Sequence, residues 1–227
     1  VERLAACIWR PTTEPCDNRI SLVIYGIYYA AGLLAGAAIV TYLASWPFAL
    51  PFYLLAAFCL YFFRDPEREI PQGPVAVSPA DGKVVSIIPW EQTGGKRISI
   101  FLNVFDVHVN RSPVGGKIMC VTYTKGEFLV ASKEEASTQN ERNTLTVEAR
   151  FGDRTTRVVF KQIAGILARR VVCWKNQGDT VARGERIGLM KFGSRVDVEM
   201  PASYAVLVKV GERVQAGSSV LANPPAK

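Results

Sequence analysis

The sequence is poor in the residues that bind metals or form disulfides. It has one histidine, His108, and five cysteines, which are odd in number, far apart and never in a CxxC pair. A disulfide framework or a metal site is therefore not expected, and a reducing compartment is the simpler location. The sequence also has no basic helix, zinc-finger spacing or aromatic ribonucleoprotein motif, so we expect no nucleic-acid partner.

Formal charge is missing from a long stretch near the N-terminus. Residues 20–63 are 44 consecutive residues without a charged side chain, about twice the ~20 that one helix needs to cross a bilayer. Pro47 and Pro51 interrupt this stretch, and proline removes a backbone donor and clashes with the preceding turn. We therefore expect two helices with a bend, from Ile20 to about Ala44 and from Phe48 to about Phe63.

Arginines flank the apolar stretch on both sides, at Arg3, Arg10, Arg19, Arg64 and Arg68. This bias predicts a membrane hairpin with both ends on the cytoplasmic side of the cell (inner) membrane. A buried helical pair in a soluble protein and a hairpin that dips into one leaflet are the alternatives. The expected order is a cytoplasmic segment 1–19, a membrane hairpin 20–63, a charged and proline-rich linker 64–74, and a second domain 75–227.

The excess of positive charge belongs to the C-terminal part of the chain. Residues 71–227 hold 22 Lys/Arg against 14 Asp/Glu, whereas residues 1–70 hold five against six. Such an excess attracts an anionic surface, for which acidic lipid headgroups are the natural candidate after a membrane segment. We therefore expect anionic membrane lipids as a partner.

Short runs typical of β-strands fill the second domain. They are rich in Val, Ile, Thr, Phe and Tyr and are broken by Gly, Asp, Asn and Pro: GKVVSII, RISIFLNV, GKIMCVTYT, NTLTVEARF, TRVVFKQI and YAVLVKV. The domain is therefore predicted to be mainly β.

One pattern occurs twice in this domain. Residues 177–188 (QGDTVARGERIG) and 210–221 (VGERVQAGSSVL) share G-[DE]-x-V-x-x-G-x-x-[IV], with leading glycines 33 residues apart. Because glycine allows positive φ, each copy is predicted to be a tight hairpin that joins two short strands. Two such hairpins around a central stretch resemble the half-barrel of biotinyl and lipoyl carrier domains. We expect a barrel- or sandwich-like β domain with hairpin repeats, preceded by a pair of membrane helices.

His108 is the first candidate for chemistry, because imidazole is the default general acid or base near neutral pH. If its segment is a strand, alternation places Asp106, His108 and Asn110 on one face. Asp81, in SPADGKV, offers two readings. It either caps a turn, which the spacing alone favours, or orients His108 and stabilises its cationic form.

Gly193 and Ser194, in KFGSRVDV, raise the question of a nucleophile. A serine hydroxyl is weak at its free pKa and needs an adjacent base. The chain has several other serines, including Ser86, Ser99 and Ser137, so the residues alone do not select Ser194.

Three motifs, SPADGKV, FDVHVNRSPVGG and FGSRVDV, follow YFFRDPER in this order. Together they closely resemble phosphatidylserine decarboxylase proenzymes, in particular the short bacterial and archaeal-type forms, over nearly the whole chain. The resemblance implies self-cleavage after Gly193 into a β chain, 1–193, and an α chain, 194–227, which stay together. Ser194 would become a covalent pyruvoyl group, the only cofactor, with His108 and Asp81 assisting.

The implied activity is the conversion of phosphatidylserine to phosphatidylethanolamine and CO2. The pyruvoyl ketone would form a Schiff base with the serine amine of the lipid and accept the electrons that CO2 leaves behind, as pyridoxal phosphate does elsewhere. A small Gly193 would let its carbonyl be approached closely. A homodimer is left open.

The chain departs from the longer bacterial relatives at one position. Those carry a second histidine where this sequence has Arg111. Either His108 serves both self-cleavage and decarboxylation, which we favour, or Asp81 acts on Ser194 more directly and Arg111 binds the substrate phosphate or carboxylate. Arg111 and Asn103 are the candidates for substrate contact.

Two other interpretations of the chain compete with this one. Lys191, after Met190, is placed as in a biotin or lipoate carrier, although LMKFG lacks the second methionine of a biotinylation site. A membrane-anchored β protein without catalysis is the third interpretation.

Overall fold

The structure is a computed structural model that describes residues 18–90, 94–151, 154–166, 171–191 and 193–224. It consists of two compact units, Pro15–Glu67 and Arg68–Lys227. The cytoplasmic segment expected at residues 1–19 lies outside the described residues except for its last two.

Two helices form the first unit, α1 (Asn18–Leu43) and α2 (Trp46–Phe62). The chain turns at Ala44 and Ser45, as the prolines predicted. Pro47 lies in the first turn of α2, where a missing N–H costs little. The expected interruption at Pro51 is wrong, because Pro51 lies inside α2, where it removes one hydrogen bond near the start of the helix.

Small residues bring α1 and α2 together. Ala30, Ala37, Ala49 and Ala56 are buried, and a Cβ on Gly26 would lie 2.9 Å from the Cβ of Phe63. Many large apolar side chains face outwards instead, which is how helices pack in lipid. Within the described part of the chain, one segment, Ile24–Leu43, is long and apolar enough to cross a membrane.

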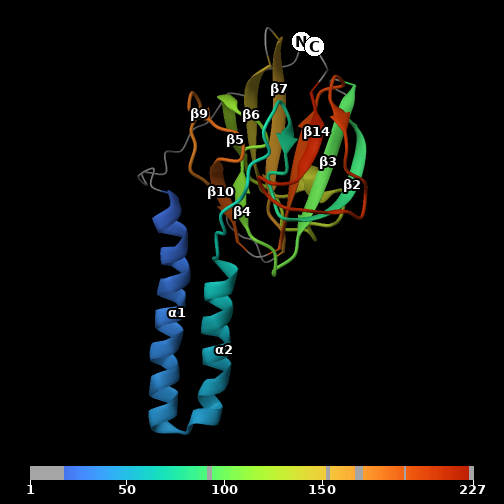
Figure 1. The fold of residues 1–227 in the computed structure, drawn as a ribbon. Helices are drawn as coiled ribbons and strands as arrows, with labels where there is room; N and C mark the ends of the chain where they lie inside the picture. Colours follow the sequence, from blue (N-terminus) through green and yellow to red (C-terminus); the bar gives the residue numbers. More distant parts are fainter. Residues whose placement is uncertain (1–17, 91–93, 152–153, 167–170, 192, 225–227) are drawn as a thin grey trace. The chain divides into compact units, whose positions relative to one another are not determined.

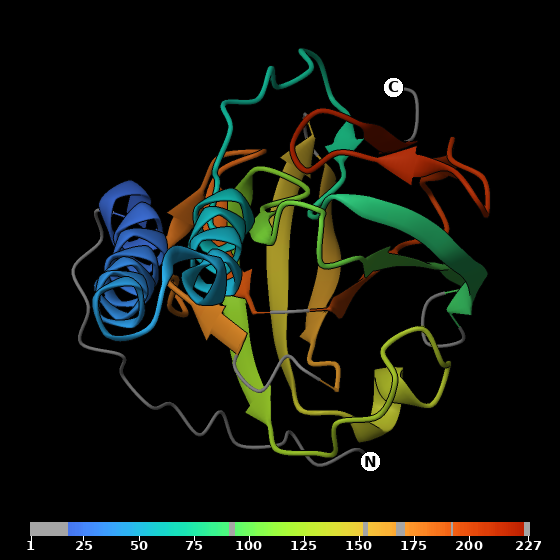
Figure 2. The same cartoon turned by 90° about the horizontal axis from the view of Figure 1, so that it is seen from below.

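An eight-stranded antiparallel sheet dominates the second unit and curls into a half-barrel (Figures 1 and 2). The prediction of a mainly β domain after an apolar helical segment is thus confirmed. In order across the sheet, the strands are β13 (Arg213–Val214), β2 (Gly82–Trp90), β3 (Gly95–Leu102), β11 (Ser194–Met200), β7 (Arg154–Ile163), β6 (Arg142–Phe151), β5 (Gly116–Thr124) and β9 (Thr180–Val181).

Two three-stranded sheets and a short helix complete this unit. One sheet has the order β1 (Ala76–Val77), β14 (Val220–Asn223), β12 (Ala205–Val206), and the other β4 (Val109–Arg111), β10 (Arg186–Met190), β8 (Val171–Cys173). Helix α3 (Ala136–Gln139) precedes β6. YAVLVKV yields only the two residues of β12, because the chain leaves the sheet again after Val206.

The two sequence repeats do not form hairpins in which their own strands pair. In the first repeat β9 pairs with β5 and β10 with β4 and β8; in the second β13 pairs with β2 and β14 with β1 and β12. The glycine turns are present, with φ of 73° at Gly184 and 80° at Gly217. Each turn instead carries the chain from an edge of the large sheet into a small sheet. The glycine pattern specified the reversal, but not the partner of each short strand.

The repeats belong to a larger pseudo-symmetry. The N–H of Gly184 donates to the Ser112 carbonyl (2.8 Å), and the N–H of Gly217 donates to the Ser78 carbonyl (2.7 Å). Ser78 and Ser112 begin matching sequences, SPADGK and SPVGGK, that lead into β2 and β5. In the strand order of the large sheet, β13, β2, β3 and β11 therefore mirror β9, β5, β6 and β7.

Strand β11 lies between β3 and β7, and all seven of its residues are buried. Val196, Val198 and Met200 point into the apolar core. Arg195 and Asp197 alternate with them and are also fully buried. Burying these charges requires partners, because an isolated ion in a low-dielectric interior is strongly disfavoured.

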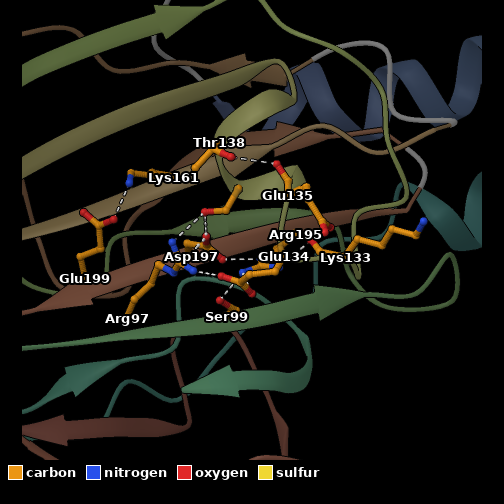
Figure 3. Close-up of polar contacts among 11 residues, drawn as sticks. Arg97, Ser99, Lys133, Glu134, Glu135, Thr138, Lys161, Arg195, Asp197 and Glu199 are labelled. Atoms are coloured by element: carbon orange, nitrogen blue, oxygen red, sulfur yellow. Dashed lines mark hydrogen bonds and ion pairs between the residues drawn. The ribbon is translucent and has the colours of Figure 1, made fainter. Parts of the chain in front are cut away.

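Arg195 binds its partners in what we call the Arg195 cluster: Arg97, Ser99, Glu134, Ser137, Arg195 and Asp197 (Figure 3). The guanidinium donates to Asp197 (2.6 Å), to Ser99 Oγ (2.7 Å) and to Glu134 (3.1 Å). It also donates to the carbonyl of Lys133 (3.0 Å). One side chain thus fastens the segment before α3 to the strand that begins at Ser194.

We expect Arg195→Met to lower the free energy of unfolding by about 3–5 kcal/mol, because the buried Asp197 would lose its close ion pair and keep only Ser137 and the more distant Arg97. Guanidinium chloride unfolding of the full chain in detergent, followed by tryptophan fluorescence, measures this. Arg157→Met is the matched control, since Arg157 pairs with Glu148 at 3.3 Å on the exposed side of the same sheet and such pairs contribute at most about 1 kcal/mol. Equal losses in the two variants would contradict the prediction.

Candidate functional site

Gly193 and Ser194 lie where the chain enters β11. Ser194 is the first residue of the strand and pairs with Leu102, the last residue of β3. Gly193 precedes the ladder with φ of 61°. The peptide bond between them therefore joins a left-handed turn residue to the central part of the sheet.

His108 reaches the same place from the segment before β4. It is buried, and the N–H of Gly193 donates to its Nε2 at 3.3 Å. Its Nδ1 lies 2.9 Å from the carbonyl oxygen of Asp106. A neutral imidazole has one donor and one acceptor nitrogen, so these two contacts assign the proton to Nδ1 and leave the lone pair of Nε2 facing Gly193.

The expected strand through Asp106 and His108 is wrong in part. Residues Val104 to Asp106 form a turn and β4 begins only at Val109. The Asp106 carboxylate accepts a hydrogen bond from the N–H of Asn103 (2.8 Å) and pairs with Arg213. This side-chain turn competes with strand geometry, as Asp commonly does. Asp106 therefore contributes its carbonyl, not its carboxylate, to His108.

Asn103 is exposed in this turn, where its side-chain oxygen accepts a hydrogen bond from the N–H of Phe105 (3.3 Å). Arg111 lies elsewhere: its side chain is buried and donates to the carbonyl of Gly184 (3.0 Å). The Arg111 guanidinium thus braces the glycine turn of the first repeat. Substrate contacts by Asn103 and Arg111 stay predictions.

Asp81 caps the glycine turn of the second repeat. Its carboxylate accepts hydrogen bonds from Arg68 (2.7 Å) and from the N–H of Ala216 (2.7 Å). Burial raises the pKa of Asp81 above its ordinary value, and the Ala216 hydrogen bond and the Arg68 charge act against that rise. A backbone hydrogen bond from Val107 also lowers the pKa, so Asp81 lies beside the segment that carries His108. The orientation of His108 by Asp81 stays a prediction.

Two residues that the sequence analysis did not identify, Gly165 and Asn140, help to position the bond between Gly193 and Ser194. A Cβ on Gly165 would lie 2.1 Å from the carbonyl oxygen of Gly193, so only glycine fits there. Asn140 is fully buried and donates to the carbonyls of Leu129 (2.9 Å) and Ala164 (2.7 Å). The signal for Gly165 was a glycine two residues after the end of a predicted strand, because glycine often marks a close backbone approach.

Gly193 is not the glycine whose Cβ position is closely approached by another backbone segment. A Cβ on Gly193 would meet nothing within 4 Å apart from its two chain neighbours, so packing by the rest of the chain does not explain the glycine. That its small size exposes its carbonyl to Ser194 stays a prediction. Its φ of 61° explains the glycine, because other residues are strained in that region. The close packing that was assigned to Gly193 occurs at Gly165, across from it.

Two buried polar atoms of the site make no hydrogen bond within the described part of the chain. They are Ser194 Oγ and Asn110 Nδ2. The other end of the Asn110 amide accepts a hydrogen bond from Gln162 (2.8 Å). Buried polar groups are nearly always paired, so an unpaired Ser194 hydroxyl is an unusual feature of this site.

Lys191 follows β10 directly and does not lie at the tip of a paired hairpin, because β10 and β11 belong to different sheets. Among the described residues, no group of three or more His, Cys, Asp or Glu side chains is placed so that it could bind a metal ion.

Comparison with known proteins agrees with this geometry. Residues 55–222 match the family model for phosphatidylserine decarboxylase. The chain is 60% identical over 203 residues to a phosphatidylserine decarboxylase proenzyme of Solibacter usitatus, covering 89% of this chain and 97% of that protein. Proenzymes of the same name from Aromatoleum aromaticum (45% identical; 87% and 93% covered) and Nitratidesulfovibrio vulgaris (48%; 79% and 84%) are also similar. The chain therefore belongs to the phosphatidylserine decarboxylase family.

Proposed function

We propose that this chain cuts itself after Gly193 and then decarboxylates phosphatidylserine to phosphatidylethanolamine and CO2 with a pyruvoyl group made from Ser194. The observation that carries the proposal is the contact of the Gly193 N–H with Nε2 of His108, beside a buried Ser194 hydroxyl. The names of the similar proenzymes supply the substrate.

The first step is attack of Ser194 Oγ on the Gly193 carbonyl carbon. A C–O bond forms while the C–N bond breaks, and the hydroxyl proton passes to the freed amine. His108 is suited to carry this proton: with Nδ1–H fixed on the Asp106 carbonyl, Nε2 can accept a proton and release it again. Gly165 lets the Gly193 carbonyl sit where no side chain obstructs it.

The resulting ester then eliminates. The Cα proton of Ser194 is lost, the Cβ–Oγ bond breaks, and Gly193 departs as the carboxylate end of the β chain. Water replaces the nitrogen of the dehydroalanine that remains, and ammonia leaves. The nitrogen on Cα of residue 194 is thereby replaced by a ketone oxygen at the first residue of the α chain. No oxidant or reductant is needed.

A pyruvoyl group fits position 194 because the hydroxyl that it replaces makes no hydrogen bond with the described residues. Such a group supplies a ketone that condenses with the serine amine of the lipid and accepts the electrons left by CO2. Strand β11 would hold it at the edge of the core, and His108 would remain the group able to hold or deliver a proton beside it.

The sheet also keeps the two chains together after the cut. Strand β11 stays paired with β3 on one side and β7 on the other, while β13 and β14 of the α chain remain in two different sheets. With the helical pair as membrane anchor, we propose that the catalytic unit works at the cytoplasmic surface of the cell membrane.

Purified protein should run as two fragments on a denaturing gel and as one species in native detergent solution. The smaller fragment should resist Edman sequencing and be lighter by one ammonia than residues 194–227 with a free amine. Ser194→Ala should give an intact chain without decarboxylase activity, because no ketone can form. Wild-type protein that is active as a single uncut chain would overturn the proposal.

Gly165→Ala should slow self-cleavage by about a hundredfold or more, because the new methyl group would displace the Gly193 carbonyl, and an ångström-scale misplacement can cost that much. The time course of fragment formation after synthesis in vitro measures it. Gly32→Ala is the control, since Gly32 lies in helix α1 and a Cβ there would meet nothing within 4 Å. Cleavage of Gly165→Ala at the control rate would show that the close approach is irrelevant.

A further inference from the structure

Four large apolar side chains are exposed on loops around Gly193. We call them the apolar rim: Phe105, Phe128, Val130 and Ile166. Phe105 is 61% exposed and Ile166 53% exposed, although each is large enough to be buried in most proteins. The rim residues come from three loops that are far apart in the sequence, after β3, after β5 and after β7.

Contacts on the described residues bring these loops to the same bond. The loop after β3 carries Phe105 and then His108, which holds the Gly193 N–H. The loop after β7 carries Gly165, directly against the Gly193 carbonyl, and then Ile166.

The third loop joins the other two at Asn140. Its side chain holds the backbone of Leu129, between Phe128 and Val130, and that of Ala164. A Cβ on Gly165 would lie 3.3 Å from the Cβ of Ala131 in the same loop. All three loops are therefore held around the Gly193–Ser194 bond rather than scattered over the surface.

We propose that the apolar rim inserts into the interfacial layer of the membrane and seats the site over the headgroup of a bilayer phospholipid. This rests on the proposed function, which requires a lipid headgroup to reach Ser194 while its tails stay in the bilayer. Apolar side chains that surround a buried polar centre match that arrangement, because the rim contacts acyl chains and the polar groups contact the headgroup.

The structure favours a membrane over a second protein as the occupant. The same chain carries a segment able to span a bilayer, so the rim is held at high effective concentration near lipid whatever the protein concentration. A stable protein interface buries roughly 800 Å² on each side, more than four side chains on loop tips supply. A second copy seated on the rim would also cover the bond that the substrate has to reach.

The depth of residue 105 in the membrane tests directly whether the apolar rim inserts. Phe105→Trp, in the full chain reconstituted into vesicles of phosphatidylserine and phosphatidylcholine, should gain quenching by brominated lipids relative to the wild-type protein. Val210→Trp is the matched control, because Val210 is 60% exposed on the loop between β12 and β13. Equal quenching in the two variants would overturn the proposal.

Kinetics with two forms of one substrate provide the second test. Phe105→Ser/Phe128→Ser should raise the apparent KM for phosphatidylserine in vesicles by about tenfold, since burial of apolar area is lost. Its kcat/KM for a monomeric short-chain phosphatidylserine should stay within about twofold. Equal losses on both substrates would show that the rim serves the catalytic centre and not the membrane.

The two measurements also separate this inference from the proposed function. Quenching needs no catalysis, so a rim that inserts in an inactive or uncut chain would sustain the inference while the proposed function fails. If Phe105→Trp is not quenched and Phe105→Ser lowers the molecular mass of the protein–detergent complex in sedimentation, the rim is a contact between copies and the inference fails.

Discussion

The sheet holds β11 on both sides, and the proposed function requires this hold to persist while the peptide bond at the N-terminal end of the strand breaks. The strand pairs through seven residues with β3 and through five with β7, so its backbone groups are satisfied by neighbours that the cut does not touch. Gly193 lies outside this ladder, in a left-handed turn. The bond at which we propose the cut thus joins a left-handed turn residue to a strand that is paired on both sides.

Pseudo-symmetry explains how one half of the unit could become a site. The two halves match in strand order and in the SPADGK and SPVGGK turns, yet Asp81 in the first corresponds to Gly115 in the second. The Asp81 carboxylate caps the N–H of Ala216. At the equivalent place a Cβ on Gly115 would lie 3.3 Å from the nitrogen of Arg183. The arrangement of strands and turns is thus repeated in the two halves, whereas the polar groups beside Gly193 occur in one half alone.

The fold was predictable where local pattern decides it. Val- and Thr-rich runs predicted β2, β3, β5, β6 and β7, and the uncharged stretch predicted the two helices, because burial follows alternation and length. Strand partners in the repeats were not predictable, since two-residue strands carry too little pattern to choose between sheets. The roles of Gly165 and Asn140 were not predictable either. Their contacts form only when the chain after β7, the loop after β5 and Gly193 are brought together by the fold.

The site raises the question of how one histidine can serve where longer relatives have two. His108 is oriented by the backbone carbonyl of Asp106, while the Asp106 carboxylate is occupied by Asn103 and Arg213. A carbonyl fixes the tautomer without adding negative charge beside the ring. Nε2 accepts the N–H of Gly193 (3.3 Å), at the strand end that begins with Ser194. In the proposed mechanism this nitrogen would meet the Gly193 amide and the Ser194 hydroxyl before the cut, and the ketone made from Ser194 after it. Under that proposal, one histidine at this strand end would serve both steps.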